Sequence, residues 1–556
     1  MPIASDLLRA GRSEELWQMC CGFLDLNISQ FMEIQERLLL KQLELLNKCQ
    51  LGRKLLRGKT PQTLDEFRHS VPLTTYKDYC PELMEKQEDV LPGKPVLWAR
   101  SSGRSGDYNC KWLPLTQDYI DCLSVLLYGI GMLSCARYKG DVSRIPRDAK
   151  LLYSVAPKPY ISGTFADVLR MQTPLEYLPS SEESEKMTFE ERISLGFQQA
   201  LDKGLDYFFG LSMVLVKVGD KLIENSGKID IKPYIKRPRA LYRLAKGLVK
   251  SKLARRPLMP KDVWDVKGII GSGIDSWVYK DKIVDFWGKE PLDLYSSTEG
   301  GVIATQAWDY DGMTFIPNLN LLEFIPEEEQ LKNLMDGSYQ PKTLLLDELR
   351  AGETYEIVIT SFHGGALVRY RIGDIIKITY LKNETLGISI PQMSFERRSD
   401  GIIDLAVIRL TEKTLWQILE ESGIKYQDWV AYKVPGVQVL DLYIEPKEDY
   451  KDKKEELEAL IYDRIMRSYE TLVEDMYDFR VKIHFLENGF FSNYSMQKQK
   501  EGADLAHIKP PHINPRGEIL QRLLGDTEET IVISKPDKIK DKTITAQEPK
   551  EEKISL

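Results

Sequence analysis

Apolar residues recur along the chain at spacings that are typical of buried helices and strands. Near the start, Leu38, Leu39, Leu43, Leu46 and Leu55 follow a helical period, so the first hundred residues are predicted to be mainly helical. Residues 122–136 form a run of about fifteen uncharged residues, which is too short to span a bilayer. This run is predicted to be a buried helix.

Strand-like patches alternate with helix-like patches in the rest of the chain. Residues 355–361 and 367–378 are rich in β-branched and aromatic residues, and the turn at 363–365 predicts that they are adjacent strands. Residues 437–445 resemble a strand, and a helical period follows. This second period comprises Leu457, Leu460, Ile461, Ile465, Tyr469 and Leu472. The alternation predicts an α/β fold.

Composition indicates a globular chain long enough for more than one domain. It has 556 residues, of which 42% are hydrophobic and 29% charged. The formal net charge of −8 gives no general attraction to nucleic acid or to anionic membranes. We therefore expect neither as a partner.

One basic segment departs from this balance. Residues 228–256 contain eleven Lys/Arg residues and the single acid Asp230, with Tyr234 and Tyr242 among them. A nucleic-acid or phospholipid patch is one interpretation. A solvated helical face is the favoured one, with Glu182, Glu183 and Glu185 as an electrostatic counterpart elsewhere on the surface.

The cysteines and the first residues indicate a cytoplasmic protein. Charged residues interrupt the apolar residues of positions 1–17, so no signal-peptide core is expected there. The cysteines show no spacing typical of metal sites, and their odd number, confined to the first quarter of the chain, favours reduced thiols. They occupy positions 20, 21, 49, 80, 110, 122 and 135.

The segment Ser101-Ser102-Gly103-Arg104-Ser105-Gly106, which continues to Lys111, is a candidate phosphate loop. Glycines allow backbone N–H groups to converge on an anion, hydroxyls add donors and a lysine adds charge. The segment does not have the P-loop spacing, so a surface turn is the alternative.

A carboxylate lies at the end of another predicted strand. In residues 294–301, Tyr295 precedes two serines, Thr298, Glu299 and two glycines. At a strand end in a cleft, Glu299 could hold a Mg²⁺ ion that bridges phosphates, and Tyr295 could offer its ring to a purine. A plain turn is the alternative.

Asp374 is the third candidate. It follows Gly373, where a ligand can approach the backbone closely, and a carboxylate can accept hydrogen bonds from both hydroxyls of a ribose. An ion pair with Arg369 or Arg371 fits these residues equally well.

Together these stretches resemble the auxin-responsive (Gretchen Hagen) acyl acid amido synthetases, a branch of the firefly-luciferase-like adenylate-forming superfamily. The resemblance covers almost the whole chain. Residues 67–73 with Tyr76 are similar to the family pattern "FK..VP...Y", and Glu323-Phe324-Ile325-Pro326 to "EFIP". The block 352–374, similar to "GK.YELVVT…GLYRYR.GD", is the most specific.

The resemblance extends into the last third of the chain. Residues 395–401 resemble the family hinge ("F.GR"), which includes Arg398. Residues 502–511 are similar to "GAS…QYKTPR", which gives Lys509 the position of a lysine delivered by a mobile lid. An ammonium group in a closed, dry site would stabilise the charge that develops during adenylation.

The resemblance implies a role for each matched residue. Ser101, Ser102, Gly103, Ser105 and Gly106 would hold the β- and γ-phosphates of ATP with help from Lys111. Tyr295 would lie near adenine, Thr298 would contact the α-phosphate, Glu299 would hold Mg²⁺, Asp374 would bind ribose, Arg398 would mark the hinge and Lys509 would activate adenylation. Thr298, Glu299 and Lys509 are the catalytic candidates.

Two residues depart from the family pattern. Arg104 replaces the threonine of Ser-Ser-Gly-Thr in a loop that is one residue longer than usual, and it either binds phosphate or spoils the loop. Arg397 replaces a hinge glycine, which would restrict rotation of the lid.

The resemblance implies an α/β enzyme with a large N-terminal ATP- and acyl-binding domain (residues 1–395) of mixed sheets and flanking helices. A small mobile α/β lid (396–526) and a charged, disordered tail (527–556) would follow. Such an enzyme would use ATP and Mg²⁺ to adenylate a small carboxylic acid and would pass the acyl group to an amine, most simply an amino acid. Transfer to coenzyme A and a degenerate, non-catalytic nucleotide-binding protein are the alternatives.

Overall fold

The computed structural model describes residues 3–101, 111–154, 158–184, 187–226, 232–272, 276–399, 403–405, 408–433, 438–468, 479–500 and 512–515. Two compact units are present. The larger comprises Met1–Thr411 with two short later segments, and the smaller begins at Glu412. Each is described by itself. No helix in the described part of the chain is long and apolar enough to cross a membrane.

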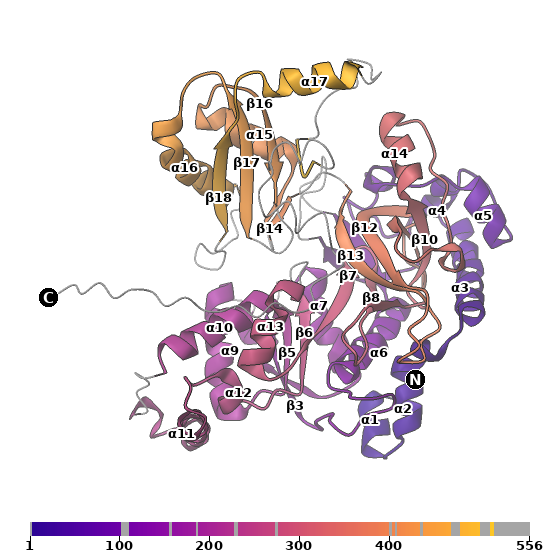
Figure 1. Ribbon diagram of the computed structural model, residues 1–556. Coiled ribbons are helices and arrows are strands. Elements are labelled where there is room, and N and C mark those ends of the chain that lie inside the picture. Colours follow the sequence, from indigo (N-terminus) through magenta and orange to yellow (C-terminus); the bar gives the residue numbers. More distant parts are fainter. Residues whose placement is uncertain are drawn as a thin grey trace. The chain divides into compact units, whose positions relative to one another are not determined.

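An eleven-stranded mixed sheet forms the centre of the larger unit, in the order β10-β11-β12-β13-β9-β8-β7-β6-β5-β3-β4 (Figure 1). The strands from β4 to β7 are parallel, and those from β7 to β10 are antiparallel. The two kinds of pairing therefore meet at β7. The strands are β3 (Ala149–Ser154), β4 (Leu175–Leu178), β5 (Tyr207–Leu211), β6 (Gly268–Ser272), β7 (Pro291–Ser297), β8 (Gly301–Thr305), β9 (Met313–Phe315), β10 (Asn320–Pro326), β11 (Thr354–Ser361), β12 (Tyr370–Tyr380) and β13 (Gln392–Arg398).

Two small hairpins complete the strands of this unit. β1 (Pro95–Arg100) pairs with β2 (Trp112–Thr116), and β14 (Ile403–Leu405) pairs with β15 (Ile408–Leu410), both antiparallel. The candidate phosphate loop is thus the connection between β1 and β2. Its residues 102–110 lie outside the described residues.

Helices cover the sheet. In Figure 1, α9, α10 and α13 lie on one side of the parallel strands and α6 on the other. The helices of the unit are α1 (Ala4–Arg9), α2 (Ser13–Cys21), α3 (Ile28–Lys48), α4 (Gln50–Leu55), α5 (Leu64–Ser70), α6 (Gln117–Leu133), α7 (Ile161–Arg170), α8 (Ser181–Ser184), α9 (Phe189–Lys203), α10 (Ser212–Glu224), α11 (Pro238–Leu253), α12 (Pro260–Val263), α13 (Ser276–Trp287) and α14 (Glu327–Met335).

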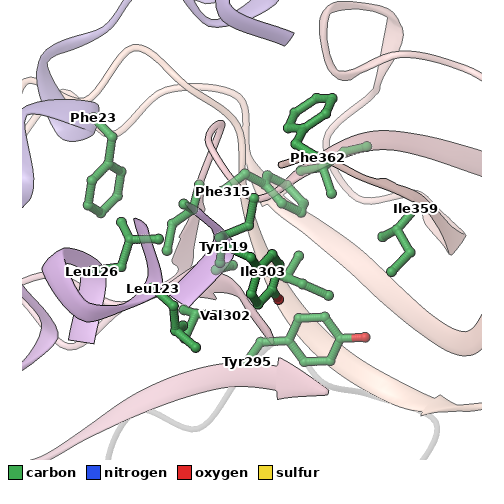
Figure 2. Close-up of a cluster of buried hydrophobic side chains, with 14 of the residues drawn as sticks. Phe23, Tyr119, Leu123, Leu126, Tyr295, Val302, Ile303, Phe315, Ile359 and Phe362 are labelled. Carbon is green, nitrogen blue, oxygen red and sulfur yellow. The ribbon is translucent and has the colours of Figure 1, made fainter. Parts of the chain in front are cut away.

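The uncharged run of residues 122–136 is a buried helix, as predicted. It forms most of α6, whose N-cap Thr116 accepts a hydrogen bond from the backbone N–H of Tyr119. Figure 2 shows Tyr119, Leu123 and Leu126 of this helix pointing toward Val302 and Phe315 of the sheet. Burial of these side chains fixes α6 against the antiparallel half of the sheet.

Other predicted elements are also confirmed. The leucines near the start fall on α3 and α4. The strands predicted at 355–361 and 367–378 are β11 and β12, which pair antiparallel. The basic segment contains α11, an amphipathic helix, as the favoured interpretation expects.

The smaller unit is also α/β. Its sheet has the order β16-β17-β18, with β16 and β17 antiparallel and β17 and β18 parallel. The elements are α15 (Glu412–Ser422), β16 (Tyr426–Tyr432), β17 (Val439–Pro446), α16 (Lys454–Arg467), β18 (Arg480–Phe485) and α17 (Phe490–Lys500). The strand predicted at 437–445 and the following helix correspond to β17 and α16. The contacts between residues divide the chain after Thr411. The domain boundary predicted between residues 395 and 396 stays a prediction.

Arg369, immediately before β12, joins three distant parts of the larger unit. Its Nε and Nη2 donate to Glu323 in β10 at 3.0 and 2.7 Å, and Nη2 also donates to Thr343. Its Nη1 donates to the carbonyl oxygens of Arg68 and Val71, each at 2.5 Å. The guanidinium group thereby uses all five of its N–H donors. Arg369 is 5% exposed and Glu323 is fully buried.

We expect Arg369→Met to lower the free energy of unfolding by about 3–5 kcal/mol, because the buried Glu323 carboxylate loses its hydrogen-bonded cation and keeps the more distant Arg68, whose Nε lies 4.0 Å from Oε1. Urea unfolding at pH 7 measures this difference. Arg350→Met is the matched control: the Arg350 side chain is 79% exposed and pairs with Glu353, so its loss should cost less than about 1 kcal/mol. Equal losses of stability in the two variants would contradict the anchoring role of Arg369. So would a double variant, Arg369→Met with Glu323→Gln, that recovers no stability relative to Arg369→Met alone.

Candidate active site

Glu299 lies in the turn between β7 and β8, where the parallel half of the sheet ends. The side-chain hydroxyl of Ser297 accepts from the backbone N–H of Gly300, and Asn320 donates to the Gly300 carbonyl at 2.7 Å. Gly301 has a φ of +62°, and a Cβ there would approach the hydroxyl of Tyr119 to 2.2 Å. The turn therefore requires glycine at this position, and it holds Glu299 at the carboxyl end of a parallel strand, where α/β proteins bind ligands.

Lys111 is the partner of Glu299. Its Nζ donates to Glu299 Oε1 at 2.9 Å and to the Tyr370 hydroxyl at 2.8 Å. The lysine and glutamate side chains are only 7% and 11% exposed. Burial by itself raises the pKa of Glu299, but the charge and hydrogen bond of Lys111, together with the charge of Arg398, outweigh burial, and the pKa is lowered. Glu299 is therefore ionised at neutral pH.

The base of the candidate phosphate loop leads directly to this pair. The Ser101 N–H donates to the Lys111 carbonyl, and the Lys111 N–H donates to the Ser101 hydroxyl, both at 2.9 Å. Both residues are buried. The two ends of the loop are thus joined next to Glu299.

Asp374 forms a second cluster with Tyr295 and Arg398. The Tyr295 hydroxyl donates to Asp374 Oδ2 at 2.7 Å, and Arg398 Nη1 donates to Oδ1 at 2.6 Å. Burial and the neighbouring Asp374 charge raise the pKa of the Tyr295 phenol, so it remains a donor. Because Arg398 also lowers the pKa of Glu299, the two clusters share one electrostatic environment.

An irregularity in β12 aims Asp374 into this cluster. Val358 of β11 pairs with Arg371 of β12, and Glu356 pairs with Ile375. Two residues of advance along β11 therefore correspond to four along β12. Gly373, inside the irregular stretch, has a φ of +80°, and Asp374 lies directly opposite Arg398 of β13. Such bulges change the direction of a side chain. Here the bulge faces Asp374 toward Arg398.

Tyr295 reaches the same place from another strand of the sheet. Tyr295 is in β7, three strands from β13 in the sheet order, yet its ring centroid lies 6.2 Å from that of Phe395 in β13. In Figure 2 its ring borders the apolar cluster, and its hydroxyl points away from Val302. Tyr295 is 7% exposed, and its contribution to adenine binding stays a prediction.

The structure thus brings Ser101, Lys111, Tyr295, Glu299, Asp374 and Arg398 into two adjacent clusters. Thr298 lines a cavity of about 10 Å³ with Glu299, Pro114 and Ala366. Ser102, Gly103, Ser105, Gly106 and Lys509 lie outside the described residues, as does Arg104. The side chain of Arg397 is also not among those that the structure describes. The roles of all these residues stay predictions.

The alternative ion pair for Asp374 with Arg369 or Arg371 is wrong. Arg369 binds Glu323, and Arg371 forms a bidentate pair with Glu356 in β11 at 2.7–2.8 Å. Lys111 pairs with the proposed Mg²⁺ ligand Glu299, and its contribution to phosphate binding stays a prediction.

Sequence reasoning also missed three residues of the site. Tyr370 receives the second hydrogen bond of Lys111, Ser297 shapes the Glu299 turn, and Asn320 supports it. Tyr370 lies inside the most specific motif, which is a signal that could have identified it. Nothing local marks Asn320, since its role depends on the contact between β10 and the turn.

Comparison with known proteins finds two matches to one family. The model of the GH3 family N-terminal domain matches residues 21–161, and the model of the GH3 family central domain matches residues 313–398. These two stretches are thus similar to domains of the GH3 family. They contain Ser101, Lys111, Asp374 and Arg398, which are residues of both clusters.

Several curated proteins are similar to this chain. A 4-substituted benzoates-glutamate ligase of Arabidopsis thaliana is 27% identical over 276 residues, 44% of each chain. A jasmonoyl–L-amino acid synthetase of Nicotiana attenuata is 37% identical over 153 residues, 26% of this chain and 24% of its own. The similarity thus spans less than half the length of these relatives. A solved acyl acid amido synthetase in complex with 2,4-DB covers 91% of this chain at 17% identity, with a TM-score of 0.49.

The Lys111–Glu299 pair predicts a pH-dependent stability. A carboxylate with a lowered pKa stabilises the folded chain above its unfolded pKa of about 4.5, and this contribution is lost as the pH falls through the folded value. We expect Glu299→Gln to lower the free energy of unfolding by about 3 kcal/mol at pH 7. This deficit should shrink below pH ~4.5.

Urea unfolding of both proteins between pH 7 and pH 3 tests the pair. Glu44→Gln, which removes an exposed carboxylate of α3, is the control and should show little difference at any pH. A Glu299→Gln deficit that stays constant down to pH 3 would contradict an ionised pair.

Proposed function

We propose that this chain is a member of the GH3 family. It would be an ATP-dependent ligase that adenylates a small carboxylic acid and transfers the acyl group to an amine, most simply an amino acid. One observation carries the proposal: three groups of residues meet at the end of β7. They are the Lys111–Glu299 pair, the base of the loop after Ser101, and the cluster of Tyr295, Asp374 and Arg398. Three sequence-distant motifs with nucleotide chemistry thereby reach one place. The names of the curated relatives support the same reaction class.

The site fits ATP as a substrate. Asp374 is held by Tyr295 and Arg398, and a carboxylate can accept hydrogen bonds from both hydroxyls of a ribose. Tyr295 and Arg398 hold the carboxylate in a fixed orientation, which lowers the cost of binding.

The site also fits a Mg²⁺ ion at Glu299. Magnesium is usually held by one or two carboxylates with phosphate oxygens, and an ionised, partly accessible Glu299 meets that need. When bound, the ion would neutralise charge on the phosphates. Lys111 now donates to Glu299 Oε1, so we propose that Lys111 turns toward a phosphate when the carboxylate is taken.

The proposed reaction has two steps. A carboxylate oxygen of the acid attacks the α-phosphorus, and the bond to the leaving pyrophosphate breaks. The amine then attacks the acyl carbon of the acyl-AMP, loses a proton and displaces AMP. Lys111 and the loop donors would bind the leaving pyrophosphate, and Lys509 would stabilise the charge of the first step.

We also propose a cytoplasmic location. The six described cysteines are free thiols, and burial raises the pKa of Cys20 and Cys122 to about 12. Such thiols fit a reducing compartment.

Acid-dependent exchange of labelled pyrophosphate into ATP tests the proposed function. We expect exchange with at least one member of a broad panel of small carboxylic acids, because the first step is reversible. Products formed with amino acids and with coenzyme A are then identified by mass. Amide products support the proposal, thioester products assign coenzyme A as the acceptor, and no exchange with any acid indicates a non-catalytic nucleotide-binding protein.

Lys509→Ala should reduce exchange by about 10²–10³-fold while ATP binding stays close to normal, since the lysine acts in the transition state. Exchange kinetics and ATP titration measure the two effects. Lys447→Ala, which removes an exposed lysine of the same unit, is the control. Normal exchange in Lys509→Ala would show that the lysine has no catalytic role.

A further inference from the structure

Helix α11 has an exposed face on which cations and apolar side chains alternate. Tyr242, Val249 and Leu253 are 67%, 58% and 81% exposed. Arg239, Lys246 and Lys250 are exposed beside them. The positions follow a spacing of 3, 7, 10, 11 and 14 residues from Arg239, so all six share one side of the helix. We call these six residues the basic face of α11.

The opposite side of α11 is already used in packing. Ala240, Leu244, Gly247 and Ser251 are buried, and the helix contacts α9 and α12. Arg243 donates to two carbonyl oxygens at the end of α9. The basic face is therefore not needed to hold the helix in place. Figure 1 shows α11 at the margin of the larger unit.

The cations of the basic face form no ion pair of their own among the described residues, although the charge of Lys250 also acts on Asp262. Arg239, Lys246 and Lys250 make no ion pair with a carboxylate in the described part of the chain, whereas Arg237, just before the helix, pairs with Asp202. This local excess of cations stands out in a chain whose net charge is −8. It would attract an anionic partner.

We propose that the basic face of α11 binds the surface of anionic phospholipid bilayers. The helix would lie in the plane of the interface, with Tyr242, Val249 and Leu253 among the acyl chains and the cations at the phosphates. The three apolar residues extend over ~16 Å of helix. This proposal does not depend on the proposed function.

The apolar side chains favour a bilayer over other anionic partners. Nucleic acid is bound through phosphates by cations and polar groups, and such binding would leave Val249 and Leu253 in contact with water. A second copy of the helix would bring like charges together, because Arg239 and Lys246 lie on the same stripe as Tyr242. A bilayer interface accommodates both kinds of side chain at once.

Sedimentation of the full chain with vesicles tests the proposal. We expect binding to vesicles of phosphatidylcholine and phosphatidylserine, and much weaker binding to phosphatidylcholine alone. The triple variant Arg239→Gln, Lys246→Gln, Lys250→Gln should weaken binding on the order of 100-fold. The triple variant Tyr242→Ser, Val249→Ser, Leu253→Ser should weaken it by at least about tenfold.

A matched control removes three exposed cations elsewhere, by Lys41→Gln, Arg57→Gln and Lys59→Gln. This variant should bind close to normally, and thermal unfolding should confirm that all variants are folded. Equal binding by the apolar variant, or an equal loss in the control, would overturn the proposal. So would a preference for duplex DNA or RNA over the vesicles, or self-association of the chain that the apolar variant abolishes.

Discussion

The buried guanidinium group of Arg369 is the constraint on which the arrangement of the larger unit depends. It lies before β12 in a left-handed conformation with a φ of 44°, which a non-glycine residue adopts at some cost. Its five donors offset that cost by joining the segment after α5, β10 and the start of β12. Thr74 extends this junction, because its N–H and carbonyl bond to the backbone of Arg369 and Arg371. The position of β12 in turn sets that of Tyr370 and Asp374.

Each buried charge of the candidate site has a partner from a different part of the chain. Lys111 lies at the end of the β1–β2 connection and meets Glu299 after β7, while Asp374 of β12 meets Arg398 of β13. Buried ion pairs contribute little net stability, but they penalise arrangements in which one member is left alone. The pairs therefore act mainly to keep the motifs in one relative position.

Local patterns in the sequence predicted the elements better than they predicted the contacts. The uncharged run that forms α6 and the β-rich runs of β11 and β12 carry their own periodicity, so their type could be inferred without knowledge of the fold. The partner of Asp374 could not. Nearness in sequence favoured Arg369 and Arg371, but a bulge of β12 and its register with β13 select Arg398, 24 residues away. The same holds for Lys111, whose link to Glu299 spans 188 positions.

The place of α11 in the topology has a consequence for the divergence of this chain from its relatives. The helix lies in the crossover from β5 to β6, whose two strands pair directly with each other in parallel. The ends of that crossover are fixed by the sheet, and the buried side of α11 is fixed by α9 and α12. The outward residues of α11 are restrained neither by the sheet nor by packing against α9 and α12. Mutations can therefore accumulate on that face without disturbing the candidate site at the end of β7, so the proposed membrane-binding surface can evolve separately from the proposed reaction.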